Sequence, residues 1–152
     1  MAEPRLRTVN KATAPFDVNK FPVSLVHTLA QNVVYMMATK QSMSLEGNEW
    51  EQIFAECVGA DWKPSNVGLD DVVLDNCCWG AKTVFGQTDI EHQNKVRLIC
   101  GRNAVTYSFG VDNYSEVDPN KLGEMVLQIW NERVSAVRQV FKFVRTVVLV
   151  KS

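Results

Sequence analysis

Residues 70–84 read DDVVLDNCCWGAKTV, and this stretch decides the fold. Two runs of β-prone residues flank Asp75-Asn76, and both turn residues tolerate the positive φ of a tight hairpin. A two-residue turn fixes the register by counting along the two strands. The predicted pairs are Leu74 with Cys77, Val73 with Cys78, Val72 with Trp79 and Asp71 with Gly80.

Asp71 and Lys82 fall on the same face of this hairpin because side chains alternate along a strand. They are diagonal neighbours, about 7 Å apart along the backbone, which a lysine side chain can span. Gly80 shares their face and has no side chain. The pair is therefore either an ordinary ion pair on a solvated sheet, which stabilises little, or part of a site.

Length and composition indicate one globular domain. The chain has 152 residues, of which 46% are hydrophobic and 22% charged, enough to bury a core. No apolar run approaches the ~20 residues that cross a bilayer, so we expect no membrane partner. The four cysteines (Cys57, Cys77, Cys78 and Cys100) lack metal-ligand spacing. We expect them to be buried thiols of a cytoplasmic protein.

Charge is distributed unevenly along a chain whose net charge is −1. Residues 1–20 carry four cationic and two acidic side chains, residues 21–120 carry six and thirteen, and residues 121–152 carry six and two. An acidic middle between basic ends is compatible with a metal-dependent enzyme that acts on a polyanion. Chance gives the same pattern, so it permits this function without requiring it.

Periodicity and turn signals predict the remaining elements. After a flexible arm over residues 1–20, the domain spans residues 21–152. Helices are expected at 22–40, at 44–58 with Gly59 as its stop, and from Asp118-Pro119 to about Phe143. Further strands are expected at 95–100, more weakly at 104–111, and at 144–151. The predicted fold class is α/β, with a central mixed β-sheet flanked by helices.

Glu51 is the second residue that suggests a site. It lies at the edge of the apolar stripe of its predicted helix, and its own face carries small or apolar residues: Gly47, Ala55 and Val58. An acid in such surroundings lies either at a solvated margin or over a site. Because Gly80 leaves one side-chain position empty, a carboxylate from this helix could fill the space.

These residues resemble the PD-(D/E)XK nuclease superfamily, particularly its restriction endonuclease-like proteins. The resemblance rests on Gly47-Asn48-Glu49-Trp50-Glu51, Gly68-Leu69-Asp70-Asp71-Val72, Trp79-Gly80-Ala81-Lys82-Thr83 and Cys100-Gly101-Arg102-Asn103. It covers roughly residues 44–151, and the motifs are short. The chain departs from the family at Gly80, where the family has an acid two residues before the lysine. Some members supply that acid from another element, and Glu51 is the candidate.

The resemblance implies a restriction endonuclease-like core and Mg²⁺-dependent phosphodiester hydrolysis. Mg²⁺ prefers oxygen ligands and keeps several waters, so one or two carboxylates suffice. Asp71 would ligate it, Glu51 would bind it directly or through water, and Lys82 would orient the attacking water. Asp70 is the fallback ligand, although its side chain should point away from the face of Lys82. If Glu51 does not supply the second carboxylate, Glu91 and Glu124 are the next candidates.

Four residues are predicted to contact DNA: Arg102, Asn103, Arg138 and Lys142. Arginine suits phosphate or guanine and asparagine suits adenine, although Gly101-Arg102-Asn103 could equally be a plain turn. Arg138 and Lys142, with Arg133, form either a solvated helix face or a surface that follows phosphates. His27 and His92 are isolated, and neither is assigned to a site.

The sequence therefore predicts a Mg²⁺-dependent DNA endonuclease, of restriction type, acting on double-stranded DNA as a homodimer in the cytoplasm. The alternative is a non-catalytic α/β domain for DNA binding or assembly, in which the acid–lysine pair is structural. Because the chain ends directly after a predicted strand, we also expect it to be the N-terminal part of a longer enzyme.

Overall fold

The computed structural model of the chain describes residues 13–65, 68–86, 89–96 and 109–152. In chain order its elements are α1 (Val23–Lys40), α2 (Gly47–Val58), β1 (Asp61–Trp62), β2 (Val72–Leu74), β3 (Cys77–Phe85), the 3₁₀ turns η1 (Ile90–His92) and η2 (Tyr114–Glu116), α4 (Pro119–Arg138) and β4 (Phe143–Lys151). The strands form one sheet in the order β1-β2-β3-β4. Strands β1, β2 and β3 are antiparallel neighbours, whereas β4 runs parallel to β3. The predicted α/β class with a mixed sheet is confirmed.

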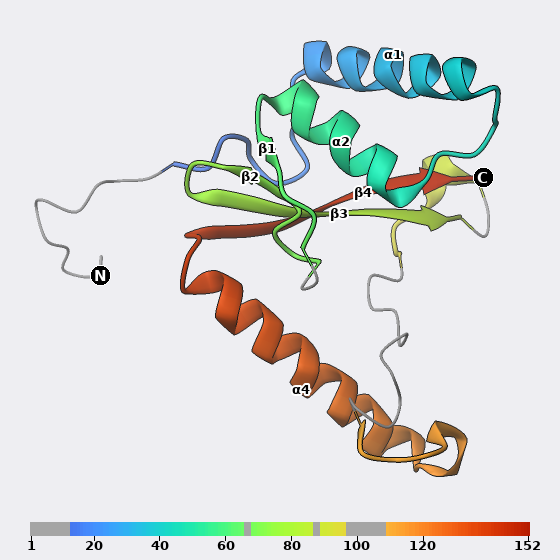
Figure 1. Cartoon of the computed structure of the whole chain (residues 1–152), viewed down its shortest axis with the longest axis vertical. Helices are drawn as coiled ribbons and strands as arrows, with labels where there is room; N and C mark the ends of the chain where they lie inside the picture. Colours follow the sequence, from blue (N-terminus) through green and yellow to red (C-terminus); the bar gives the residue numbers. More distant parts are fainter. Residues whose placement is uncertain (1–12, 66–67, 87–88, 97–108) are drawn as a thin grey trace, which may run out of the picture.

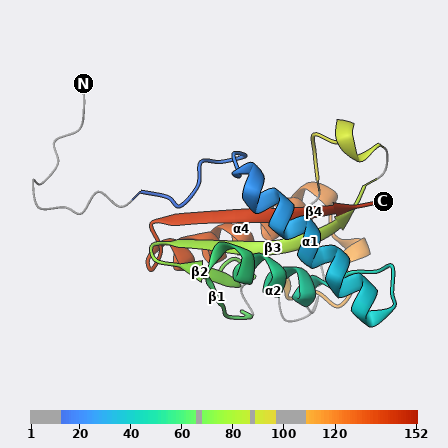
Figure 2. The same cartoon turned by 90° about the horizontal axis from the view of Figure 1, so that it is seen from above.

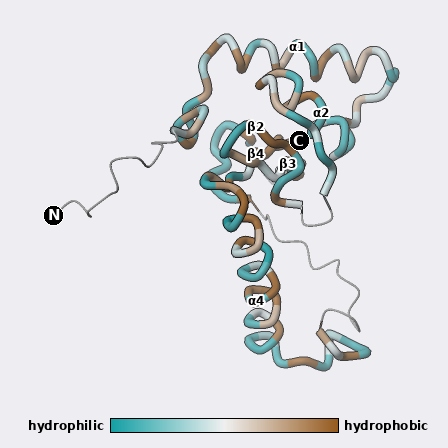
Figure 3. Tube along the Cα trace, turned by 60° about the vertical axis from the view of Figure 1, so that its left-hand side comes forward, coloured by the Kyte–Doolittle hydropathy of each residue, from teal (hydrophilic) through white to brown (hydrophobic). Residues whose placement is uncertain are grey.

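Helices lie on both faces of the sheet, with α1 and α2 on one side and α4 on the other (Figures 1 and 2). Under α1 and α2 the main core includes Phe54, Val72, Cys77 and Trp79. Under α4 a smaller cluster joins Leu69, Cys78 and Val137, with Val73, Trp130, Val134, Phe141 and Val144 packed against it. Hydrophobic residues recur at intervals along α4 (Figure 3). Only the C-terminal part of the helix approaches the sheet (Figure 1), and Val137 is its one buried residue among those described.

The hairpin has the register obtained by counting. Leu74 pairs with Cys77, Val73 with Cys78 and Val72 with Trp79. Asp75 adopts a φ of 50° at the turn, which an aspartate tolerates better than most residues. Strand β2 begins at Val72, so Asp71 lies one residue before the regular strand. The turn chemistry therefore predicted these three pairs correctly, whereas the fourth predicted pair, Asp71 with Gly80, lies beyond the end of β2.

The start of α4 and the end of α2 are also where local signals place them. The Asp118 carboxylate accepts hydrogen bonds from the N–H groups of Asn120 and Lys121, and Pro119 opens the helix. Gly59 ends α2 with a φ of 69°. In both places the signal consists of one or two residues that satisfy or redirect the helix's own backbone groups.

The predicted end of α4 is wrong. The helix ends at Arg138 rather than near Phe143, and Val140, beyond its end, is exposed. The N–H of Phe143 donates to the carbonyl of Asn76, and the chain then pairs with β3 from Cys77 onward. A run rich in β-branched residues gains a central sheet partner there, which outweighs helix propagation.

Other expectations are corrected or left untested. The loop before the hairpin contains β1, which the sequence did not predict. The predicted strands at 95–100 and 104–111 lie mostly outside the described residues, and their described ends, 95–96 and 109–111, are not in strands. Within the described ranges, no helix combines the length and apolar character needed to span a bilayer.

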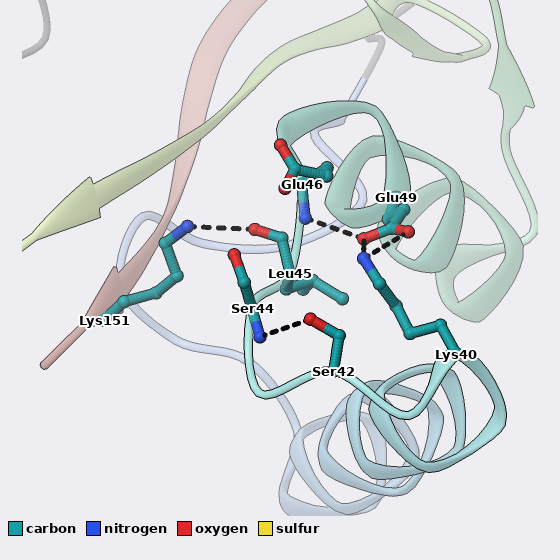
Figure 4. Close-up of polar contacts among 7 residues, drawn as sticks. All are labelled: Lys40, Ser42, Ser44, Leu45, Glu46, Glu49 and Lys151. Carbon is teal, nitrogen blue, oxygen red and sulfur yellow. Dashed lines mark hydrogen bonds and ion pairs between the residues drawn. The ribbon is translucent and has the colours of Figure 1, made fainter.

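A set of polar contacts fixes the connection between α1 and α2 (Figure 4). The Lys40 ammonium lies 2.7 Å from both carboxylate oxygens of Glu49, and Glu49 also accepts the backbone N–H of Glu46. The Lys151 ammonium donates to the carbonyl of Leu45 at 2.9 Å. Strand β4 and helix α1 therefore both hold the N-terminal end of α2. This matters for function because α2 positions Glu51.

Candidate functional site

Asp71 and Lys82 form an ion pair on the hairpin, as the register predicts. The Lys82 Nζ lies 3.3 Å from Asp71 Oδ2. The Asp71 side chain is 3% exposed and that of Lys82 is 34% exposed. A buried carboxylate faces a half-buried ammonium, so this is not the fully solvated surface pair that the sequence left open.

The second carboxylate oxygen of Asp71 organises the preceding loop. The backbone N–H of Ser65 donates to Asp71 Oδ1 at 3.3 Å, and the N–H of Lys63 donates to the Asp71 carbonyl at 2.7 Å. Both donors come from the segment that follows β1. Asp71 therefore has a structural role as well as any chemical one, because it closes this loop over the hairpin.

Gly80 does not leave an empty side-chain position, and this corrects the sequence prediction. A Cβ atom at residue 80 would lie 2.6 Å from the Gly68 carbonyl oxygen and 3.1 Å from the Cα of Leu69. The backbone of residues 68–69 occupies the space that a carboxylate would need. Gly68 itself has a φ of 68°, and a Cβ there would be 3.2 Å from the Lys82 ammonium. Two glycines thus let a loop pack directly on β3.

Glu51 lies on α2 within electrostatic reach of the pair. Its Oε2 accepts the indole N–H of Trp62, on β1, at 3.1 Å. Burial raises the pKa of the Glu51 carboxyl above its ordinary value. The Trp62 hydrogen bond opposes this shift, the negative charge of Asp71 adds to it, and the positive charge of Lys82 reduces it. The link between Glu51 and the pair is therefore electrostatic, and among the described residues no hydrogen bond or ion pair joins Glu51 to Asp71 or Lys82.

Trp62 is the member of this neighbourhood that sequence reasoning missed. It occurs in a short polar stretch that reads as the start of a loop, and it is 37% exposed. An indole N–H close to a site usually finds a hydrogen-bond partner. That property is the only sequence signal that could have singled it out.

Asp71 and Glu51 carry the type of ligand atom that a hard cation prefers. Asp71 and Glu51 offer carboxylate oxygens, and Mg²⁺ completes its coordination with water. Asp70 Oδ1 is buried and has no hydrogen-bond partner among the described residues, so a third carboxylate oxygen is available nearby in sequence. The described part of the chain contains no group of three or more histidine, cysteine, aspartate or glutamate side chains already arranged to hold a metal.

Asp70 lies two residues before β2, which begins at Val72, so strand alternation does not fix the direction of its side chain. The charges of Asp70 and Asp71 both act on Cys78, whose pKa is raised to about 12, chiefly by burial. Cys78 faces α4, as Lys82 does. Cys77, on the opposite face, has a pKa raised to about 11, again by burial. At neutral pH both thiols are protonated and inert.

Of the predicted DNA-binding residues, the two that the structure describes, Arg138 and Lys142, do not lie with the pair. Arg102 and Asn103 are outside the described residues. Arg138 and Lys142 are exposed where α4 ends and β4 begins. Cys77 pairs with Phe143, and Lys82 pairs with Val148. Lys82 is therefore five residues along the strands, about 16 Å, from the place where α4 ends and β4 begins.

The fallback acids are not brought to the hairpin by any contact between described residues. Glu91 lies exposed in η1. Glu124 lines a shallow hollow of about 620 Å³ whose residues belong to α4 and its C-cap, Gln139. Glu51 therefore remains the best-placed partner for Asp71.

Comparison of the chain with family models, curated proteins and solved structures found no match to any of them.

Proposed function

We propose that the protein is a Mg²⁺-dependent DNA endonuclease of restriction type, with a restriction endonuclease-like core. The observation that supports this most is the buried Asp71 carboxylate, 3.3 Å from the Lys82 ammonium. The charges of both residues affect the pKa of the Glu51 carboxyl. An acid at the start of a hairpin, a lysine on its second strand and an acid on the preceding helix are among the features on which the family resemblance rests.

Each residue has a role that its surroundings favour. Asp71 and Glu51 would hold the cation, with Asp70 as a third oxygen donor. When bound, Mg²⁺ polarises the phosphate and lowers the pKa of the attacking water. The ion pair with Asp71 holds the Lys82 side chain in place. Because that side chain is 34% exposed, its ammonium can reach a phosphate oxygen on which negative charge develops. Trp62 holds the Glu51 carboxylate in place through its indole N–H.

The wider proposal concerns partners and location. Double-stranded DNA is the partner, and two copies of the chain act on the two strands as a homodimer. The described cysteines (Cys57, Cys77 and Cys78) are free thiols, which suits the reducing cytoplasm. Size-exclusion chromatography with light scattering, with and without a DNA duplex, tests the dimer.

A cleavage assay tests the proposal directly. Wild-type protein is incubated with plasmid and mixed linear DNA in Mg²⁺, in Mn²⁺ and in EDTA, beside Lys82→Ala under the same conditions. Wild type should cut only with a divalent ion, and the variant should be at least about 10²-fold slower. Equal cutting by both proteins, or cutting in EDTA, would contradict the proposal.

A non-catalytic DNA-binding or assembly domain is the second candidate. It is favoured by the packing at Gly80, where backbone fills the position of the missing acid, and by the bond from Ser65 to Asp71, which gives the carboxylate a structural role. DNA binding by wild type, with no cleavage across varied sequences and divalent ions, would support this candidate.

A further inference from the structure

A basic pocket lies where α4 ends and β4 begins. Its volume is about 470 Å³, and it is lined by Arg138, Phe141, Lys142, Phe143, Val144 and Arg145. Three of the six lining residues are cationic and none is acidic. The lining thus combines three positive charges with two aromatic rings in a concave surface.

The cations of the basic pocket are not neutralised by neighbouring acids. Among the described residues, no ion pair joins Arg138, Lys142 or Arg145 to a carboxylate. The Lys142 Nζ and the Arg145 guanidinium carbon each lie 5.9 Å from the centroid of the Phe143 ring. Cation–π contacts hold a charge in place without cancelling it.

The helix dipole explains only part of this cluster. Arg138 is in the last turn of α4, where a cation stabilises the exposed carbonyl groups. Lys142 and Arg145 lie beyond the helix, and the effect falls off within one turn. Two of the three charges therefore lack a role in helix stability.

The N-terminal segment reaches the domain beside the same pocket. The Arg145 guanidinium donates to the carbonyl of Phe16, and the Phe16 ring packs edge-on against Phe21, with 5.6 Å between centroids. In Figures 1 and 2 the described N-terminal residues lie at the same end of the molecule as the start of β4. The described N-terminal segment thus contacts β4 through Arg145, which also lines the basic pocket.

We infer that the basic pocket binds backbone phosphates of DNA, as a contact separate from the hairpin site. This inference rests on the proposed function for its choice of polyanion. The pocket lies about 16 Å from Lys82 along the strands. That length corresponds to about five base pairs of duplex, so one bound duplex can meet both places. The pocket supplies affinity, and the hairpin supplies the chemistry.

Binding without hydrolysis tests the inference. Anisotropy of a labelled 20-base-pair duplex is measured in EDTA between 50 and 200 mM KCl, for wild type and Arg138→Ala/Lys142→Ala. Each lost phosphate contact should reduce the slope of log K against log salt by about 0.9, so the double variant should lose close to two units. The control is Lys121→Ala, an exposed lysine at the opposite end of α4, which should keep the wild-type slope.

The outcomes separate this inference from the proposed function. A wild-type slope in the double variant, an equal loss in Lys121→Ala, or no DNA binding by wild type would overturn it. Binding with the expected slopes but without cleavage in Mg²⁺ would support the pocket and contradict the nuclease. A second arm adds inorganic phosphate at constant ionic strength. If phosphate binds wild type but not the double variant, while both bind DNA equally, the pocket takes a free anion instead and the inference is wrong.

Discussion

Gly80 packs against the backbone of Gly68, so closely that a Cβ atom at residue 80 would lie 2.6 Å from the Gly68 carbonyl oxygen. Real Cβ atoms do not approach a carbonyl oxygen this closely, so any side chain at residue 80 must displace the loop. The same loop leads into the buried Asp71. Glycine at residue 80 is therefore a packing requirement of this chain.

Gly80→Ala should destabilise the protein by about 1–3 kcal/mol, the usual cost of overpacking a close contact. Gly80→Glu should be worse, and it should not increase metal binding, because its side chain has no room on this face. Urea denaturation followed by circular dichroism measures both. Gly123→Ala, in α4 with no atom near its Cβ position, is the control and should gain about 0.5–1 kcal/mol. If Gly80→Ala is as stable as the wild type, the loop moves away from residue 80 at little cost and the prediction is wrong.

Lys82→Ala should separate a chemical role from a structural one. The variant should lose about 1–3 kcal/mol of stability, because a buried carboxylate loses a charged hydrogen-bond partner. Its turnover on DNA should fall at least about 10²-fold, with DNA affinity little changed, because the lysine acts on the transition state.

Lys63→Ala is the matched control for Lys82→Ala. Lys63 belongs to the segment between β1 and the hairpin. Its side chain is mostly exposed, and its ammonium lies 4.0 Å from the Asp61 carboxylate. Its loss should cost under about 1 kcal/mol. Thermal melting and cleavage rates are measured for both variants in the same Mg²⁺ buffer. Equal cleavage by Lys82→Ala and wild type would remove Lys82 from the mechanism.

Glu51→Gln should abolish Mg²⁺-dependent cleavage while stabilising the fold at neutral pH. The pKa of Glu51 is raised above 4.5 by burial, so the folded state binds this proton more tightly than the unfolded chain. Stability from this group is complete below the unfolded pKa and is lost as pH rises through the folded pKa. Glutamine keeps an acceptor for Trp62 and removes the charge.

The measurement is the melting temperature of Glu51→Gln and wild type between pH 4 and pH 8. The difference in favour of the variant should be smallest at pH 4 and should grow toward pH 7. Glu56→Gln, on the exposed side of α2, serves as the control and should show no such trend. Retained cleavage in Glu51→Gln would assign the metal-binding role to another acid.

Trp62→Phe should weaken divalent-ion binding without removing any ligand. The indole N–H holds Glu51 Oε2 at 3.1 Å, and loss of a partner that orients a ligand usually lowers metal affinity about 10–100-fold. Calorimetric titration with Mn²⁺, which needs no DNA, measures the affinity. Trp130→Phe, in the cluster under α4, should bind Mn²⁺ as wild type does. An unchanged affinity in Trp62→Phe would mean that Glu51 is oriented by other contacts.

The sequence by itself determined the elements whose geometry depends on neighbouring residues. The hairpin register followed from a two-residue turn, and the start of α4 followed from an aspartate cap and a proline. The placement of Asp71 beside Lys82 followed in turn from the register and the strand alternation. These features were predictable because their decisive hydrogen bonds and steric limits lie within a few residues.

Only the tertiary structure decided the features that depend on contacts between distant segments. Helix α4 stops early because Phe143 joins β3, whose first residue is Cys77. The space at Gly80 is filled by residues 68–69, and Glu51 is held by Trp62 from a strand that the sequence did not reveal. Local propensity is worth at most about 1 kcal/mol per residue. Sheet pairing and close packing across the fold outweigh it, and they depend on which segments meet in space.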